Sequence, residues 1–203
     1  MRWMCFGKKL KKMKILNNNY KTIFMKPMIY IAAIILMAMD LEAQDLLTIL
    51  PVNKNTNKIE FSEVVNVEGK PSELYTRAIA WINSFFKNAS DVTKVKDESN
   101  GIIEGKHRIR IMNKIEEGVE NLFGYVQYEF KLEFKEGRYR YTIYNFVFMD
   151  ASKQALEKWL NPKDPSHTIN TVSHLEQVDL FVKDLIKSLK QGMKPKEVIK
   201  DDW

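Results

Sequence analysis

The amino-acid sequence predicts an α+β protein, a two-layer sandwich in which two main helices cover one face of an antiparallel sheet, preceded by a signal peptide. Segments in which apolar and polar residues alternate indicate half-buried strands. Two segments with an apolar residue at every third or fourth position indicate amphipathic helices. An apolar run near the N-terminus is shorter than a membrane-spanning helix and has the length of a secretory signal.

All of the chain's excess positive charge lies ahead of the predicted domain. The formal net charge is +6, but residues 1–24 hold seven basic and no acidic residues, whereas residues 45–203 hold 24 of each sign. The basic character of the whole chain therefore does not indicate a phosphate-binding domain, and we expect no nucleic acid among the partners.

Residues 25–43 are predicted to be a signal peptide. Met28–Met39 is an apolar run of 12 residues that follows Lys26, and Ala43 suits cleavage by signal peptidase. We therefore expect an exported protein, periplasmic or extracellular, without a stable transmembrane span after cleavage. The alternative is a short buried helix or a retained signal anchor.

Composition also predicts the rest of the domain organisation. Residues 1–24 are either a basic extension that lies on an anionic membrane surface or an over-called start that translation from Met25 would leave out. Residues 44–192 contain no internal repeat and no Pro/Ser-rich linker, so they are predicted to form a single α+β domain. Residues 193–203 are predicted to be a polar tail.

The domain is predicted to begin with a strand and a helix. Asn57–Val67 alternates as a half-buried strand, and Glu63 interrupts its apolar face, which indicates a bulge or a sheet edge. Ser72 is the expected N-cap of a helix over Glu73–Lys87. The apolar stripe of that helix comprises Leu74, Ala78, Trp81, Ile82 and Phe85.

A short strand, a polar turn and a longer strand are predicted next, over Val92–Val95, Asp97–Asn100 and Gly101–Met112. The longer strand alternates, and His107 falls on its apolar face. Asn113–Asn121 is rich in acidic residues and is predicted to be a loop.

Glu136-Gly137 predicts the two-residue turn of a β-hairpin. Its first strand is Phe123–Phe134, and pairing Lys135 with Arg138 fixes the register. That register places three pairs opposite one another: Glu133 and Arg140, Lys131 and Thr142, and Glu129 and Tyr144. Strict alternation then predicts one apolar face, made of Val126, Tyr128, Phe130, Leu132, Phe134, Tyr139, Tyr141, Ile143, Asn145 and Val147.

Two more helices are predicted, a short one over Ser152–Leu160 and a long one over Thr171–Lys190. Gly192 stands where the C-cap of the long helix is expected. The apolar stripe of the long helix comprises Leu175, Val178, Val182, Leu185 and Leu189.

Packing and turn residues at the start of the domain show a likeness to a known family. These residues are Leu50-Pro51, Val64, Val65, Val67, Ser72-Glu73-Leu74-Tyr75, Ala78, Trp81, Phe86 and Asp91-Val92. The segment resembles a domain-of-unknown-function family with a TATA-binding-protein-like fold, found in exported proteins of Bacteroidota, and the resemblance extends in outline to Lys190. It implies the fold and the compartment, and it transfers no catalytic residue.

No catalytic residue, cofactor or metal site is predicted. The sequence has no Gly-rich phosphate loop, HExxH motif or EF-hand loop, and its only cysteine, Cys5, precedes the domain. His107 is expected to be a core histidine with one hydrogen-bond partner, and His174 a solvated residue on the first turn of the last helix.

The alternative to a binding protein is a hydrolase-type enzyme. Its candidate groups are the loop of Glu116, Glu117 and Glu120 and the segment Asp164–His167, which holds acid, hydroxyl and imidazole side chains. Groups that adjoin in sequence rarely form a catalytic geometry, because the fold assembles such sites from distant segments. We therefore expect solvated loops at both places.

The predicted binding site is the face of the sheet that the two helices leave open. By alternation it carries six candidate residues: Tyr125, Tyr144, Phe146, Phe148, Arg108 and Arg110. Exposed apolar surface in a soluble protein often marks an interaction site. We therefore predict a non-enzymatic interaction domain that binds an envelope protein, lipid or glycan. The alternatives are a homo-dimer formed through the same face, and a bulge or a covering segment around Trp159 that removes the aromatics from it.

Overall fold

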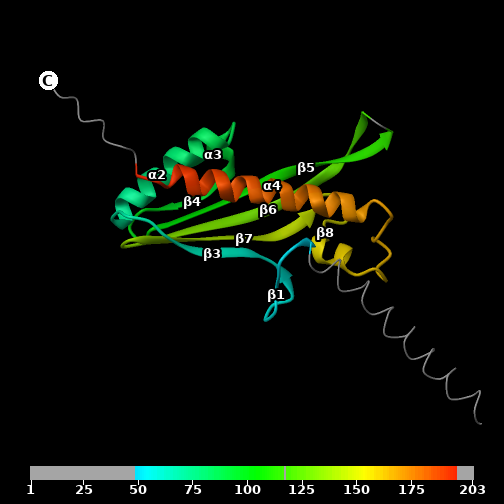
Figure 1. Ribbon diagram of the computed structural model, residues 1–203, viewed down its shortest axis with the longest axis horizontal. Helices are drawn as coiled ribbons and strands as arrows, with labels where there is room; N and C mark the ends of the chain where they lie inside the picture. The colour runs from blue at the N-terminus through cyan, green and yellow to red at the C-terminus, as the bar shows by residue number, and fades with distance from the viewer. Residues whose placement is uncertain (1–48, 117, 196–203) are drawn as a thin grey trace, which may run out of the picture. The chain divides into compact units, whose positions relative to one another are not determined.

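A computed structural model of the chain describes residues 49–116 and 118–195 (Figure 1). The predicted leader, residues 1–43, and most of the predicted tail, residues 193–203, lie outside the described residues. The elements are, in order, β1 (Val52–Asn53), β2 (Lys58–Ile59), β3 (Phe61–Asn66), α2 (Pro71–Phe85), α3 (Ala89–Val92), β4 (Thr93–Asp97), β5 (Ile102–Glu116), β6 (Val119–Lys135), β7 (Arg138–Phe148), β8 (Gln154–Ala155), the 3₁₀ helix η1 (Leu156–Leu160) and α4 (Thr171–Gly192).

One antiparallel sheet has the strand order β3-β7-β6-β5-β4, with β8 paired to the end of β7, and β1 and β2 form a separate ribbon. The helices α2 and α4 pack against each other and against the same face of this sheet, as Figure 1 shows. We call this the inner face and the opposite one the outer face. The predicted α+β two-layer sandwich is confirmed.

Strand residues of the inner face and the apolar stripes of both helices form one core. On β6 the predicted alternation is confirmed, since the five inner residues from Val126 to Phe134 are all buried. A Cβ atom on Gly105 would lie 2.2 Å from the Cζ atom of Phe130, so a glycine in β5 makes room for this ring. The buried stripe residues of the helices are Leu74, Ala78, Trp81, Ile82, Leu175, Val178, Val182, Leu185 and Leu189.

Gly192 has a different role from the predicted C-cap. It is the last residue of α4, and the C-cap is Met193, which has right-handed dihedral angles (φ −81°, ψ −10°). A Cβ atom on Gly192 would lie 2.8 Å from Cδ1 of Trp81. The glycine therefore allows α4 to approach the indole ring on α2, rather than ending the helix in a left-handed turn.

The boundaries of α2 also differ from the prediction. The helix begins at Pro71, and Lys70 is its N-cap, so Ser72 lies inside the first turn. The backbone N–H of Lys70 donates to the Glu73 carboxylate (3.1 Å), so a side chain at the third helical position bonds back to the N-cap residue. Proline suits the first helical position because its missing N–H would have no partner there.

The predicted hairpin register is confirmed from Lys135 and Arg138 through Glu129 and Tyr144. In contrast, the predicted loop Asn113–Asn121 is wrong, because β5 and β6 stay paired almost to the turn. Residues 118–122 are exposed, and apolar and polar side chains do not alternate along them, so the sequence shows no strand pattern there.

Two short segments are also assigned differently. Val92 ends the short helix α3, so the predicted strand at Val92–Val95 begins one residue later and continues to Asp97. The predicted helix over Ser152–Leu160 is divided into the two-residue strand β8 and the 3₁₀ helix η1.

Candidate functional site

The outer face of the sheet is a ladder of charged side chains. Lys106 pairs with Glu129 across β5 and β6 (2.8 Å), and Lys131 pairs with Glu104 (3.3 Å). A third pair joins β6 and β7, between Arg140 and Glu133 (2.9 Å). All of these side chains keep partial or full exposure, so the centre of the face is open and its charges largely compensate one another.

A β-bulge in β7 reverses the alternation that the predicted aromatic face required. Glu129 pairs with Tyr144, but Gln127 pairs with Val147, so β7 holds one extra residue between the two pairs. Asn145 lies at this shift with φ 54°, a left-handed conformation that asparagine tolerates better than most residues. Its side-chain nitrogen donates to Oε1 of Glu129 (3.0 Å), so Asn145 lies on the outer face.

Phe146 and Phe148 consequently lie on the core side, and their predicted place on the open face is wrong. The Phe146 side chain is 1% exposed, and its ring centroid lies 5.9 Å from that of Phe61. Phe148 stacks on Phe123 (5.1 Å) and packs on Trp159 (5.0 Å). The alternative prediction, that the strand bulges and removes these aromatics from the open face, is correct. For the same reason Asn145 and Val147, predicted to face the core, lie on the outer side of the sheet.

The other four predicted residues lie on the outer face. Tyr125 is 39% exposed and pairs in register with Arg110, while Arg108 pairs with Gln127. Tyr144 lies on β7 opposite Glu129 of β6. Glu129 is four residues from Tyr125 along β6, so the two tyrosines are separated by roughly 13 Å in the strand direction. The predicted cluster of aromatics is therefore two separate tyrosines.

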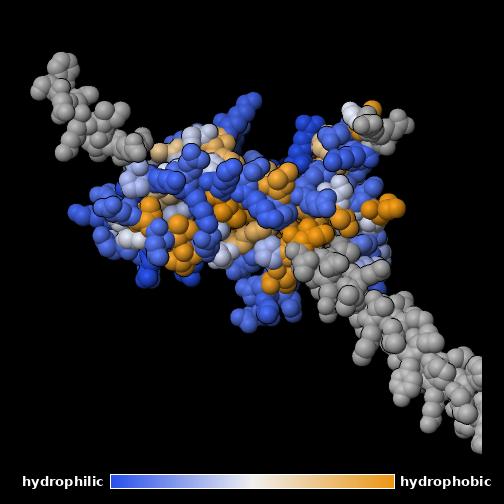
Figure 2. Space-filling view, viewed as in Figure 1, coloured by the Kyte–Doolittle hydropathy of each residue, from blue (hydrophilic) through white to orange (hydrophobic). Residues whose placement is uncertain are grey.

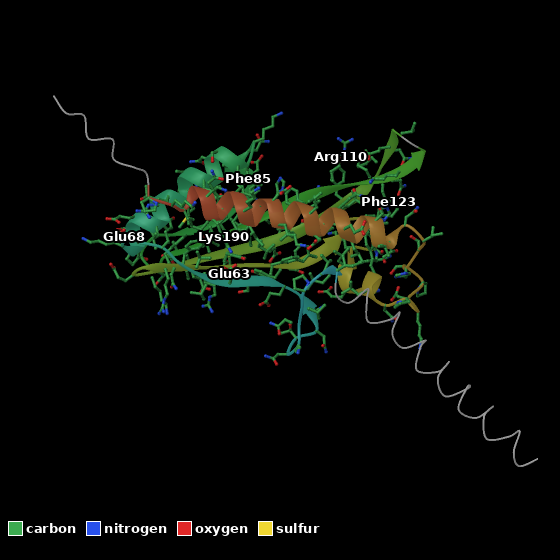
Figure 3. All side chains as sticks on the ribbon, in the orientation of Figure 1. Glu63, Glu68, Phe85, Arg110, Phe123 and Lys190 are labelled. Carbon is green, nitrogen blue, oxygen red and sulfur yellow. The ribbon has the colours of Figure 1, made fainter. Side chains whose placement is uncertain are left out.

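Arg108 and Arg110 are two outer-face cations that the ion pairs of the ladder do not include, as are Lys135 and Arg138 beside the hairpin turn. Arg108 and Arg110 are both exposed, and within the described ranges neither has a carboxylate within 4.0 Å. Figure 3 labels Arg110 on β5, alongside α4 and beyond the part of β5 that pairs with β4. Since the residues of β6 opposite Arg108 and Arg110 are Gln127 and Tyr125, no cross-strand acid neutralises this end of the face.

A cavity of about 550 Å³ adjoins Arg108 where α3 and the start of β4 meet β5. Four basic side chains and one carboxylate, Asp91, line it, together with Gln127 and other residues. The basic residues are Lys87, Lys94, Lys106 and Arg108. The excess of positive charge thus continues from the outer face around the edge of the sheet.

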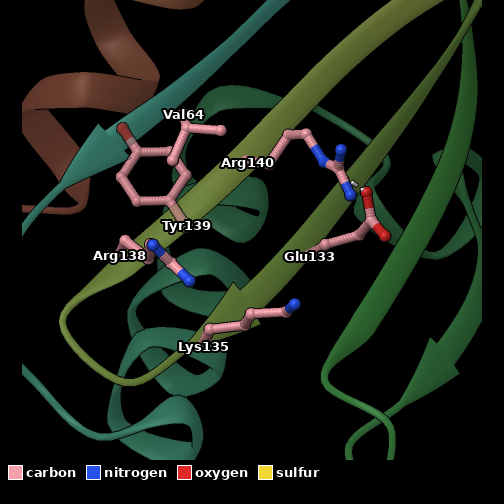
Figure 4. A pocket seen from close by; sticks show the side chains of 6 residues that line it. All are labelled: Val64, Glu133, Lys135, Arg138, Tyr139 and Arg140. Atoms are coloured by element: carbon pink, nitrogen blue, oxygen red, sulfur yellow. Dashed lines mark hydrogen bonds and ion pairs between the residues drawn. The ribbon is translucent and has the colours of Figure 1, made fainter.

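A smaller cavity, of about 170 Å³, lies at the opposite end of the outer face (Figure 4). Its lining includes Lys135 and Arg138 from the two sides of the hairpin turn, and the ion pair of Arg140 with Glu133. The hydroxyl group of the adjacent Tyr139 is buried and has no hydrogen-bond partner within the described residues. Burial and the nearby Glu63 carboxylate raise the pKa of Tyr139 to about 12.

The remaining exposed apolar residues are dispersed. Figure 2 shows a mainly hydrophilic surface interrupted by separate hydrophobic patches. The most exposed residues of this kind are Ile169 (96%) and Leu180 (62%), which lie before and within α4 rather than on the outer face.

His107 and His174 are both structural. Nδ1 of His107 lies 3.4 Å from the Tyr128 hydroxyl, which agrees with the one predicted hydrogen-bond partner, but the residue is half-buried at the cavity next to Arg108 rather than enclosed in the core, and this burial lowers its pKa. The prediction for His174 is wrong: its side chain is 2% exposed, stacks on Phe123 (4.2 Å) and has Nε2 2.8 Å from Oδ1 of Asn113. The extended β5–β6 hairpin brings these partners to the first turn of α4.

The groups proposed for a hydrolase are not brought together in the described residues. Nδ1 of His167 donates to the carbonyl of Trp159 (2.7 Å), while the Asp164 carboxylate accepts from the backbone N–H (2.9 Å) and hydroxyl (2.6 Å) of Ser166. Asp164 therefore does not orient the imidazole. Glu117 and the side chain of Glu116 lie outside the described residues. Within those ranges no three His, Cys, Asp or Glu side chains group as a metal site would require.

Residues 61–149 match the family model described as Domain of unknown function (DUF4468) with TBP-like fold. The predicted resemblance to this family is confirmed. Its description assigns no activity. No protein of curated function is similar enough to be matched.

Two solved structures from Bacteroidota share the fold. A DUF4468 family protein from Bacteroides ovatus is 15% identical, with a TM-score of 0.57 and coverage of 74% of this chain and 93% of that one. A TBP-like protein from Parabacteroides distasonis is also 15% identical, with a TM-score of 0.56 and coverage of 71% and 97%. At such identity the likeness shows the fold alone. In the described part of the chain, no helix is long and apolar enough to cross a membrane.

Proposed function

We propose that this chain is an exported, non-enzymatic interaction domain that binds an acidic protein partner through the outer face of its sheet, at Arg108 and Arg110. The observation that carries the proposal is that these two exposed arginines follow one another on the outer face with no ion pair among the described residues and no cross-strand acid, whereas Lys106, Lys131 and Arg140 are each paired with a glutamate. A guanidinium group matches a carboxylate through two parallel hydrogen bonds, so two such groups in a row suit an acidic ligand.

The neighbours of the arginines support a protein partner. Tyr125 adds a partly exposed aromatic ring beside Arg110, and tyrosine and arginine are enriched among the residues that dominate binding energy at protein interfaces. Gln127 adds an amide that can donate and accept hydrogen bonds. The charged ladder around them would form the polar rim of such an interface.

Export is supported by the signal-like composition of residues 25–43. The test is the N-terminal sequence of protein recovered from outside the cytoplasm. We expect it to begin at Gln44. Exported material with an intact N-terminus ahead of Ala43 would contradict cleavage at this site.

The binding proposal is tested with fluorescein-labelled poly-L-glutamate, an acidic polypeptide, by fluorescence anisotropy at low ionic strength. We expect the double variant Arg108→Ala/Arg110→Ala to bind at least about tenfold more weakly than the unmodified protein, the change expected when about 1.4 kcal/mol of binding free energy is lost. The matched control is Lys135→Ala/Arg138→Ala, which removes the same charge from the other end of the outer face.

The control variant should keep binding within about threefold of the unmodified protein, because a threefold change is less than 1 kcal/mol. Equal loss in both double variants would show unspecific attraction and overturn the assignment of the site. Unchanged binding in the arginine variant would overturn it as well. Circular dichroism spectra establish that all variants are folded.

A further inference from the structure

One edge of the sheet is unpaired over much of its length. β4 pairs with β5 only along Ile102–Gly105, whereas β5 continues to Glu116. Beyond Gly105, no strand of the described residues lies beside β5 on that side. Figure 1 shows β5 extending well past the end of β4. An unpaired edge of this kind is a template for the addition of another strand.

A hydrogen-bonded contact with Gln177 shows which residues direct their backbone groups toward this edge. Its Oε1 accepts from the N–H of Met112 (2.9 Å) and its Nε2 donates to the carbonyl of Met112 (2.9 Å). The side chain thus takes the place of a neighbouring strand at this residue. The register shift at Met112 adds its extra residue to β6, so β5 alternates without interruption from Lys106 to Met112.

Strand alternation then extends this orientation to the two arginines. In a strand, every second residue directs its N–H and C=O to the same side. Arg108 and Arg110 are therefore oriented like Met112, with their backbone groups toward the free edge and their side chains on the outer face. Each offers a pair of backbone hydrogen bonds and a positive charge at one position.

We propose that the acidic partner binds as an extended strand added to β5 along Lys106–Ile111, up to the residue that Gln177 already occupies, with acidic side chains at alternate positions opposite Arg108 and Arg110. This inference rests on the proposed function and specifies its geometry. Backbone hydrogen bonds would provide sequence-independent binding, and cross-strand pairs with the arginines would provide selectivity for Asp or Glu.

Charge decides between this partner and a second copy of the chain. Pairing of two β5 edges about a twofold axis would bring the basic row of one copy against that of the other, which is unfavourable for directly opposed strands. The cavity of about 550 Å³ next to Arg108 leaves space beside the first residue of β4, and its basic side chains Lys87, Lys94 and Arg108 suit the acidic end of a bound segment.

The test uses a nine-residue peptide of alternating Glu and Thr with blocked ends, and two variants methylated on the backbone nitrogens of either the Glu or the Thr residues. Only every second amide of an added strand faces the protein. We therefore expect one methylated peptide to bind at least about tenfold more weakly than the parent and the other within about threefold. Amide hydrogen exchange of Arg108 and Arg110 should slow when the parent peptide is bound.

The outcomes separate the two proposals. If both methylated peptides bind like the parent while Arg108→Ala/Arg110→Ala still weakens binding, the acidic-partner function stands and strand addition is overturned. If the parent peptide binds the arginine variant and the unmodified protein equally, the proposed function itself fails. Equal weakening by both methylations, with unchanged exchange at Arg108 and Arg110, would also overturn strand addition. Dimerisation of the free protein through β5 would contradict the choice of partner.

Discussion

The inner face of the sheet is apolar and closed by α2 and α4, whereas the outer face is charged and open. Burial of apolar surface stabilises the inner face, so each of its positions is constrained by size and shape. The outer face is organised by ion pairs between neighbouring strands, which contribute little individually when they are exposed. Stability is thus concentrated on one face, and the other can carry unpaired charge at Arg108 and Arg110, where we propose that a partner binds.

The largest expected change in stability is at the bulge in β7, where Tyr144 lies on the outer face and the next aromatic residue, Phe146, lies in the core. Phe146→Ala should destabilise the domain by about 3–5 kcal/mol, because it removes a buried ring and leaves a cavity. Tyr144→Ala is the matched control on the outer face and should cost about 1 kcal/mol or less. Urea unfolding measures both free energies, and a larger loss for Tyr144→Ala would contradict the placement of the two side chains.

An intermediate effect is expected at the residue that creates the bulge. Asn145→Val should cost about 1–3 kcal/mol, because a β-branched residue is strained at a φ of 54°. Asn145→Gly keeps that conformation accessible and should retain most of the stability, although it loses the hydrogen bond to Glu129. Thermal unfolding compares the two variants, and equal melting temperatures would show that the left-handed conformation is not required.

The smallest effect is expected at the edge of the inner face, where an ion pair joins β3 to α4. Nζ of Lys190 lies 2.6 Å from the Glu63 carboxylate. The Tyr141 hydroxyl donates to the same carboxylate (2.7 Å). Figure 3 labels Glu63 and Lys190 next to each other. These two hydrogen bonds hold the pKa of Glu63 below its usual value. A carboxyl group with a lowered folded-state pKa stabilises the protein above its unfolded pKa, and this contribution is lost as pH falls through the folded value.

Glu63→Gln should therefore cost about 1 kcal/mol or less at neutral pH, since the pair is partly exposed. The difference from the unmodified protein should shrink as the pH falls below about 4.5, the ordinary value for this group. Urea unfolding at several pH values measures it. In a Lys190→Met background the pH dependence should be smaller, and an unchanged dependence would contradict the role of the pair.

The sequence predicted those parts of the fold that local chemistry determines. The hairpin register follows from Glu136-Gly137 and from opposite charges at facing positions, such as Glu133 and Arg140, and it is correct. The stripes of α2 and α4 follow from helical periodicity and are also correct. Four of the six predicted site residues lie on the outer face for the same reason, because alternation holds wherever the strands are regular.

The prediction of which side chains face the core failed in β7 at the bulge, where one extra residue shifts the alternation. Strict alternation placed Asn145 on the apolar face, and this single polar residue was the one sign of a bulge in β7, which did not suffice to choose between a bulge and a regular strand. Once Asn145 adopts a left-handed conformation, every later residue of β7 changes face. Phe146 and Phe148 therefore enter the core, although their spacing from Tyr144 places them outside it.

The sequence by itself determined the layers of this domain, because hydrophobic periodicity over 10 to 20 residues selects strands and amphipathic helices without reference to distant segments. Only the tertiary structure decided which polar groups from distant segments meet. The hydrogen-bonded residues Glu63 and Lys190 are 127 positions apart in the sequence, and His174 and Asn113 are 61 positions apart, so no local sequence pattern could predict these contacts. The free edge of β5 is likewise a property of the assembled sheet, since it exists because β4 ends at a point where β5 continues.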